Sequence, residues 1–173
     1  MPIDRIESLI RDVPDFPKPG IVFKDITPLL RDAEALASCL DLMQEIAEDA
    51  RPDVIAGPES RGFIFGTSLA VRMGLGFVPI RKPGKLPWKT RSATYELEYG
   101  TDVLEIHQDA VGSGHRVLLV DDLLATGGTM RACGELVTDL GGDVAGCLFL
   151  IELAFLKGRE KLAGHRVDSL ITY

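Results

Sequence analysis

Short, continuously apolar runs alternate along the chain with longer segments in which apolar residues recur every three or four positions. The runs are typical of strands buried on both faces of a sheet, and the longer segments of helices that bury one face. The runs predict strands over residues 53–56, 76–80, 117–120 and 144–150, and an edge strand over 168–172. Strands that alternate with helices predict an α/β fold, with a mainly parallel sheet flanked by helices and right-handed crossovers.

Helical spacing of apolar residues predicts four helices, over residues 3–13, 33–48, 63–73 and 130–140. Asp32 precedes the second of these and is expected to cap it, because its carboxylate can accept N–H groups of the first turn. Thr27-Pro28 marks a further helix start, since proline favours the first helical position. The apolar segment 21–26 before it is expected to be extended.

A basic connection follows the strand over 76–80 and runs to Thr94, interrupted by prolines. A connection this long inside a compact domain is typical of a lid, and its lysines and arginines suit a polyphosphate. A solvated charged loop is the alternative interpretation. The alternating segment 94–106, with a turn at Gly100-Thr101-Asp102, predicts a β-hairpin that returns from the lid.

Length and charge narrow the class of protein. At 173 residues the chain is expected to form one domain, residues 1–173, and its formal net charge of −7 argues against nucleic acid or an anionic membrane as a partner. With no apolar run of membrane-spanning length and no signal-peptide pattern, a cytoplasmic location is expected. Three widely spaced cysteines with apolar neighbours, Cys39, Cys133 and Cys147, predict buried free thiols.

The strongest chemical signal lies at residues 117–129. Asp121 and Asp122 directly follow the apolar run, and two adjacent carboxylates need partners, which the hydroxyl groups of a sugar would supply. The next five residues are small or carry a hydroxyl group: Ala125, Thr126, Gly127, Gly128 and Thr129. Their backbone N–H groups can approach a phosphate closely, at the N-terminus of a helix that attracts anions. The segment lacks the patterns of a triphosphate P-loop and of a dinucleotide loop.

A second strand–loop–helix unit has polar groups in the same place. The loop after the strand over 53–56 carries Ser60 and Arg61, which could hold another anion, the arginine through its planar guanidinium group. A plain turn with a surface arginine is the simpler alternative. Two such units facing one crevice favour the functional interpretation.

Residues 117–129 resemble the phosphoribosyl-diphosphate signature of the type I phosphoribosyltransferases. Segments 16–26, 60–63, 80–87 and 95–100 narrow the resemblance to members of that family that act on adenine. The resemblance runs from about Phe16 to Lys161. It implies a single-domain type I phosphoribosyltransferase fold, with a small hood and a flexible lid loop. It also implies a glycosyltransferase of purine salvage that transfers 5-phosphoribosyl from its 1-diphosphate to N9 of adenine, giving AMP and pyrophosphate.

The same resemblance assigns roles to individual residues. Asp121 and Asp122 would accept the ribose hydroxyls, and residues 125–129 would wrap the 5′-phosphate. Pyrophosphate would be bound by Glu59, Ser60, Arg61, Arg81, Lys82 and Lys85. Adenine would contact Val22, Phe23, Lys24 and Leu123. Glu98 would be the catalytic acid/base group and Tyr99 a gate. In relatives the peptide bond that matches Glu59-Ser60 is cis.

The resemblance further implies Mg²⁺, bound mainly through the diphosphate with no direct protein ligand, and a homodimer in which Arg81 acts across the interface. Adenine and 5-phosphoribosyl 1-diphosphate would be the small-molecule partners. Two alternatives stay open. The acceptor could be another purine, such as hypoxanthine, guanine or xanthine, or the chain could be a non-catalytic regulator that senses the donor on the same fold.

Overall fold

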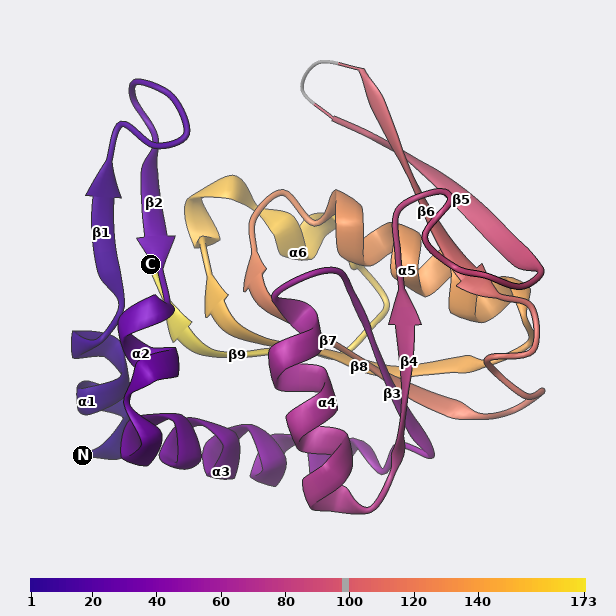
Figure 1. Ribbon diagram of the computed structural model, residues 1–173, viewed down its shortest axis with the longest axis horizontal. Coiled ribbons are helices and arrows are strands. Elements are labelled where there is room, and N and C mark those ends of the chain that lie inside the picture. The colour runs from indigo at the N-terminus through magenta and orange to yellow at the C-terminus, as the bar shows by residue number, and fades with distance from the viewer. Residues whose placement is uncertain (98–99) are drawn as a thin grey trace. The chain divides into compact units, whose positions relative to one another are not determined.

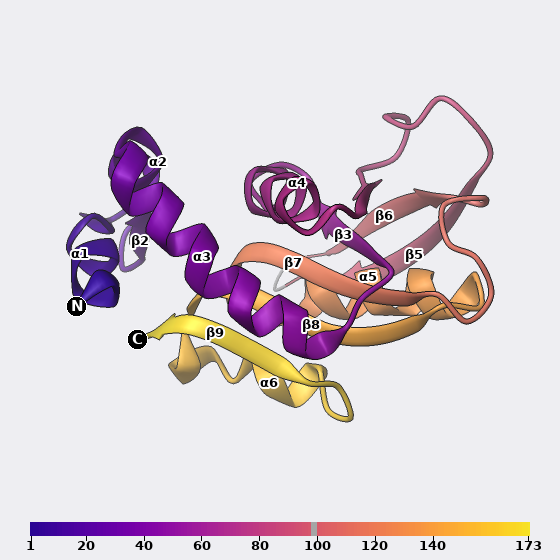
Figure 2. The same cartoon turned by 90° about the horizontal axis from the view of Figure 1, so that it is seen from below.

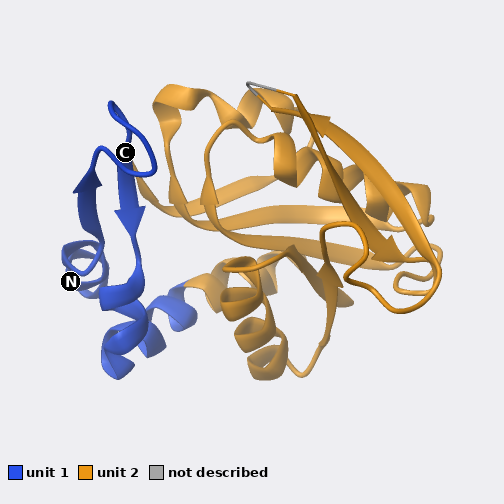
Figure 3. Ribbon diagram, turned by 45° about the horizontal axis from the view of Figure 1, so that its top comes forward, with its two compact units in different colours: residues 1–42 blue, residues 43–173 orange. Residues whose placement is uncertain are grey.

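The computed structural model describes residues 1–97 and 100–173 (Figure 1). The described chain forms two compact units, residues 1–42 and 43–173, coloured separately in Figure 3. The boundary falls within helix α3 (Ala33–Ala50). The expectation of a single domain over residues 1–173 stays a prediction.

The first unit contains α1 (Pro2–Ser8), β1 (Arg11–Pro14), β2 (Val22–Asp25), α2 (Thr27–Arg31) and the beginning of α3. The helix expected over 3–13 is therefore too long, because Arg11–Pro14 is a strand that pairs antiparallel with β2. Pairing with β2 provides hydrogen-bond partners for the backbone N–H and C=O groups of these residues, which a longer helix would otherwise have provided. Arg11 adds a cross-strand ion pair, its Nη2 lying 2.8 Å from Oδ2 of Asp25.

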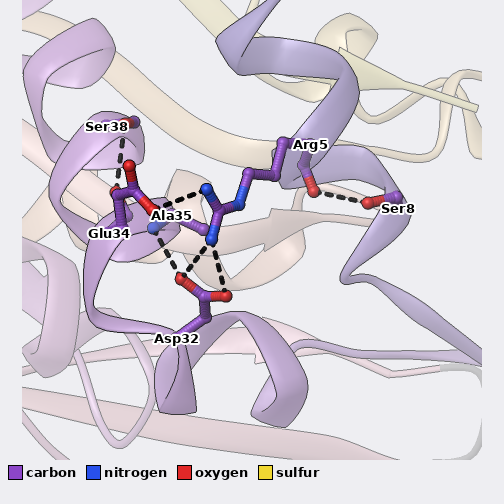
Figure 4. Close-up of polar contacts among 6 residues, drawn as sticks. All are labelled: Arg5, Ser8, Asp32, Glu34, Ala35 and Ser38. Atoms are coloured by element: carbon purple, nitrogen blue, oxygen red, sulfur yellow. Dashed lines mark hydrogen bonds and ion pairs between the residues drawn. The ribbon is translucent and has the colours of Figure 1, made fainter.

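Polar contacts hold the start of α3 to α1 (Figure 4). Arg5 Nη1 lies 2.7 Å from Glu34 Oε2, and its Nη2 lies 3.1 Å from Asp32 Oδ2. Oδ1 of Asp32 accepts the N–H group of Ala35 at 2.9 Å, so Asp32 caps α3 as expected. That hydrogen bond, followed by the contact with Arg5, lowers the pKa of Asp32.

The second unit is built on a five-stranded sheet in the order β4-β3-β7-β8-β9. Its strands are β3 (Val54–Pro58), β4 (Gly76–Ile80), β7 (Arg116–Leu124), β8 (Asp143–Glu152) and β9 (Val167–Thr172). Each neighbouring pair is parallel, and most residues of the apolar runs in β3, β7 and β8 are buried, whereas the edge strands β4 and β9 are only partly buried. The predicted α/β fold with a parallel sheet and an edge strand at the C-terminus is confirmed.

The order of the strands determines where a ligand can enter. The chain passes from β3 through α4 (Gly62–Met73) to β4, and from β7 through α5 (Gly128–Asp139) to β8, in opposite directions across the sheet. Right-handed crossovers then put α4 and α5 on opposite faces, as Figures 1 and 2 show. A crevice opens beyond the carboxyl ends of β3 and β7, where such sheets bind ligands.

A separate hairpin consists of β5 (Thr90–Glu96) and β6 (Thr101–His107). The turn expected at residues 100–102 is misplaced, because Thr101 and Asp102 lie in β6 opposite Glu96 and Tyr95. The connection from β4 is also shorter than expected, since residues 90–94 belong to β5. Cross-strand pairing, which alternation alone does not specify, sets both limits.

The cysteines are free and buried, as predicted. Burial raises the pKa of Cys39 and of Cys147 to about 12. Because the thiolate is the reactive form, we expect iodoacetamide to leave the native protein unmodified and to label all three cysteines after unfolding. Mass spectrometry of native and denatured samples checks this, and rapid alkylation under native conditions would contradict it.

Within the described residues, no helix has the length and apolarity that a bilayer crossing requires.

Candidate active site

Two loops of the second unit meet beyond the sheet, residues 59–61 after β3 and residues 125–127 after β7. A cavity of about 400 Å³ is lined by Glu59, Ser60, Arg61, Lys82, Tyr95, Leu104, Asp121, Asp122 and Thr129. A smaller cavity of about 80 Å³ is lined by Asp121, Leu123, Leu124, Ala125, Thr126, Gly127, Gly128, Thr129, Met130 and Phe149. Asp121 and Thr129 line both cavities, and Asp122 lines the larger one, so Asp121 lies where the two cavities adjoin.

The acid pair lies inside β7 rather than at its end. The strand was expected to end at Val120, but it continues to Leu124 because its pairing with β8 continues to Glu152. Asp122 is buried, and its Oδ2 lies 2.6 Å from Nε of Arg61. The Asp122 carboxylate is therefore paired with Arg61, from the loop after β3. The remaining lone pairs of this carboxylate can still accept hydrogen bonds.

Among the described residues Asp121 forms no ion pair, although the charge of Arg61 acts on it from nearby. Its Oδ1 accepts the N–H group of Asp122 at 2.8 Å. Burial, reinforced by the charge of Asp122, raises the pKa of Asp121 well above its usual range. The backbone of Gly62 lies directly beside this carboxylate. Only glycine leaves enough space there, because a Cβ atom at residue 62 would lie 2.9 Å from Oδ1 of Asp121. The loop after β3 thus packs directly against the acid pair.

The glycine loop opens α5 as predicted. Gly127 is the N-cap residue with φ of 85°, a left-handed conformation that favours glycine. A Cβ atom at Gly127 would also lie 2.5 Å from the carbonyl oxygen of Gly158, so a side chain is excluded sterically. The first N–H groups of an α-helix have no intrahelical acceptor, which leaves those of this twelve-residue helix able to bind an anion.

The loop after β3 is linked to the end of β4. The Glu59–Ser60 peptide bond is cis. Oε1 of Glu59 accepts the backbone N–H of Lys82 at 2.8 Å and Nε of Arg81 at 3.1 Å. Glu59 thus lines the cavity together with Ser60, Arg61 and Lys82 and also accepts hydrogen bonds from the segment after β4. Arg81 and Lys85 are absent from that lining.

The hairpin adds residues that the sequence analysis did not single out. Asp102 forms an ion pair with Nζ of Lys82, which lowers the pKa of Asp102 and raises that of Lys82. The Tyr95 hydroxyl donates a hydrogen bond to Oδ2 of Asp102 at 3.2 Å. Tyr95 and Asp102 are directly opposite in the β5–β6 register, a pairing that a correctly placed turn would have predicted.

The residues expected at adenine are divided between the two units. Leu123 lies in the second unit, beside the glycine loop. Val22, Phe23 and Lys24 lie on β2 of the first unit. There the ring of Phe23 packs edge-on against that of Phe16, with centroids 5.2 Å apart, and Nζ of Lys24 lies 2.6 Å from Asp12. Glu98 and Tyr99, the expected acid/base group and gate, lie outside the described residues.

The described residues contain no group of three or more His, Cys, Asp or Glu side chains arranged to hold a metal ion. Carboxylates do line the larger cavity, from Glu59, Asp121 and Asp122, and oxygen is the ligand type that Mg²⁺ prefers. These residues therefore fit a magnesium ion that brings most of its ligands with a substrate.

Comparison with known proteins agrees with this geometry. Residues 26–167 match the model of the phosphoribosyl transferase domain. The adenine phosphoribosyltransferase of Thermoanaerobacter pseudethanolicus is 57% identical over 173 residues, which cover 100% of both chains. A crystal structure of that protein superposes with a TM-score of 0.97 over 99% of both chains. The Saccharomyces cerevisiae enzyme, complexed with adenine and an imino-altritol bisphosphate, is 42% identical with a TM-score of 0.94 over 98% of both chains. The chain belongs to the phosphoribosyltransferase family and, within it, to the adenine phosphoribosyltransferases.

Proposed function

We propose that this chain transfers the 5-phosphoribosyl group of 5-phosphoribosyl 1-diphosphate to N9 of adenine and releases AMP and pyrophosphate. The supporting observation is the pair of cavities that share Asp121 and Thr129. One is walled by a glycine loop suited to a phosphate, and the other by Ser60, Arg61 and Lys82, whose hydrogen-bond donors suit a diphosphate. Full-length similarity to adenine phosphoribosyltransferases, one of them solved with adenine, supports adenine as the acceptor.

The acid pair acts on the ribose. Bond breaking at the anomeric carbon is expected to precede bond making, which leaves positive charge on the sugar. The carboxylates of Asp121 and Asp122 accept the ribose hydroxyls and stabilise that charge from the wall of the larger cavity. Residues 125–129 hold the 5′-phosphate, so the sugar is positioned at both ends.

The leaving diphosphate lies on the other side of the acid pair. Ser60 and Arg61 supply donors from the loop after β3, and Lys82 supplies positive charge from the segment after β4. The family resemblance adds Lys85 from the same segment. Glu59 orients Arg81 and the Lys82 backbone. A bound Mg²⁺ ion, held mainly by the diphosphate, would neutralise part of the negative charge of the diphosphate.

Adenine recognition falls to an aromatic and an aliphatic side chain, Phe23 and Leu123, with backbone groups of Val22 and Lys24 reading the edge of the base. A site built to hydrogen-bond the amino group rejects a base that lacks it. Glu98 accepts the N9 proton as the new bond forms, and Tyr99 acts as the gate.

A panel of purines tests this function and both alternatives. The purified chain, supplied with 5-phosphoribosyl 1-diphosphate and Mg²⁺, is expected to release pyrophosphate with adenine and to discriminate strongly against hypoxanthine, guanine and xanthine. Faster release with one of those bases would replace adenine as the acceptor. Donor binding without release, measured by calorimetry, would favour the regulator.

We also propose a homodimer in the cytoplasm, in which Arg81 acts at the partner's site. Light scattering coupled to size-exclusion chromatography measures the mass in solution. A mass near 37.6 kDa, twice the 18.8 kDa of one chain, is expected.

Mixed dimers test the role of Arg81. When an Arg81→Ala chain is mixed with a chain inactivated at Asp121, partial recovery of activity would support action across the interface, and no recovery would contradict it.

Removing the ion-pair partner of Lys82 is expected to strengthen donor binding. In Asp102→Asn, Lys82 no longer has a competing carboxylate, so the KM for the diphosphate donor should fall about two- to fivefold, the effect of an exposed pair worth up to about 1 kcal/mol. Steady-state kinetics at varied donor concentration measure this. Lys82→Met is the matched control and should raise the same KM. A higher KM in Asp102→Asn would contradict the competition.

A further inference from the structure

The segment that follows β8 has no part in the mechanism above, yet its half-exposed Arg159 forms an ion pair with a buried carboxylate at the end of β8, that of Glu152. The Glu152 carboxylate, 6% exposed, is bound at two points by Arg159, with Nε–Oε1 and Nη2–Oε2 distances of 2.7 Å. Ser169 Oγ donates to the same carboxylate at 2.8 Å, and Nη1 of Arg159 donates to the carbonyl oxygen of Val167 at 2.7 Å. The pair thus joins the end of β8 to α6 (Gly158–Lys161) and β9.

The residue before Arg159 is pressed against the glycine loop. A Cβ atom at Gly158 would lie 2.4 Å from the carbonyl oxygen of Ala125 and 2.8 Å from Cδ1 of Leu124. From the other side, a Cβ atom at Gly127 would lie 2.5 Å from the carbonyl oxygen of Gly158. The two backbones are in direct contact, with no space for one methyl group between them. The N–H of Leu153 adds a hydrogen bond to the carbonyl of Leu124 at 2.9 Å.

We propose that the Glu152–Arg159 ion pair is a positioning element for the loop that binds the 5′-phosphate. Arg159 anchors the backbone of Gly158, and Gly158 in turn supports residues 125–127 from behind, on the side away from the ligand. The inference rests on the proposed function, in which residues 125–129 hold the phosphate. A loop already held in its bound conformation loses less entropy when the ligand binds. Arg159 therefore contributes to donor affinity without touching the donor.

The test separates ligands that carry a 5′-phosphate from one that does not. In Arg159→Met we expect the Kd of ribose 5-phosphate and the donor KM to rise about tenfold, whereas the Kd of Mg-pyrophosphate and kcat at saturating donor change less than about twofold. Arg159→Lys, which keeps the charge but not both hydrogen bonds, should recover part of the loss. Calorimetry and steady-state kinetics give these values.

Arg166→Met is the matched control. Arg166 is also paired with a carboxylate, Asp168 on β9, at 2.6 Å, but it makes no described contact with the glycine loop. This variant should leave all four quantities unchanged. Thermal unfolding identifies variants that fail to fold. If Arg159→Met does not fold, Ser169→Ala, which removes one hydrogen bond from Glu152, should give the same pattern at about two- to threefold.

Two results would overturn the inference. Either ribose 5-phosphate and pyrophosphate affinities fall together in a folded Arg159 variant, or neither changes. A double-mutant cycle with Glu152→Gln should also be strongly non-additive, because the two residues act as one unit, and additive losses would count against the proposal. If the unaltered protein neither binds ribose 5-phosphate nor releases pyrophosphate, the proposed function itself fails.

Discussion

Asparagine at position 121 is expected to lower kcat/KM about 10²- to 10³-fold while making the ligand-free protein more stable at neutral pH. The loss of activity follows from the lost negative charge beside a cationic ribose. The gain in stability follows from burial, because an ionised carboxylate inside the protein is costly and the neighbouring Asp122 adds repulsion. Asparagine keeps the oxygen that accepts the N–H of Asp122.

The sign of the pH dependence follows from the raised pKa of Asp121. The native state binds this proton more tightly than the unfolded state, so the contribution to stability is fully present below the unfolded pKa, near 3.8. It is lost as the pH rises through the interval between that value and the native pKa. Asp121→Asn removes this decline, so the difference in Tm between variant and unaltered protein should be larger at pH 7 than at pH 4.

Asp143→Asn is the control for both measurements, since Asp143 is exposed and starts β8, at the opposite end of the sheet from the cavities. It should change neither activity nor Tm. Calorimetry at the two pH values and pyrophosphate release are the measurements. Asp121 would have neither proposed role if Asp121→Asn retained full activity and melted at a lower temperature than the unaltered protein.

The second large effect is expected at Glu98. Glutamine at this position can no longer accept the N9 proton of adenine, so kcat should fall about 10²- to 10⁴-fold, the usual contribution of a general acid or base. The Kd of the diphosphate donor should not change, because the residue acts on the base. Single-turnover kinetics and donor calorimetry measure the two quantities. This prediction rests on the resemblance of residues 95–100 alone, since Glu98 lies outside the described residues.

Glu96→Gln provides the matched control for Glu98. Glu96 is an exposed carboxylate at the end of β5 and lines neither of the two cavities that contain Asp121. Its replacement should leave kcat within about twofold, since isolated surface substitutions have small effects. Equal losses in the two variants would point to a general effect of charge on the hairpin rather than to proton transfer by Glu98.

Most strands and helices of the fold were predictable because their signals are local. The apolar runs of β7 and β8 are buried in the middle of the sheet, and helical spacing predicted the bounds of α3 and α4 to within two residues. The errors occurred where pairing with a distant segment decides the conformation. Arg11–Pro14 became a strand because β2 lies beside it, and β7 continued through its acid pair because β8 continues alongside.

For the candidate site, the sequence by itself determined which groups are present: two carboxylates, a glycine loop that opens a helix, and a basic segment after the strand over residues 76–80. These are properties of consecutive residues, so they can be read without knowing the fold. Similarity over the full chain then assigned the family.

Only the tertiary structure decided how those groups are paired. It joins Arg61 to Asp122 and Lys82 to Asp102, raises the pKa of Asp121 by burial, and presses Gly158 against the phosphate loop. Such contacts link residues far apart in the chain, and they depend on which strands are neighbours and how closely their loops approach. The physical reason is that ion pairing and desolvation act through distances in space, and only the folded chain sets those distances.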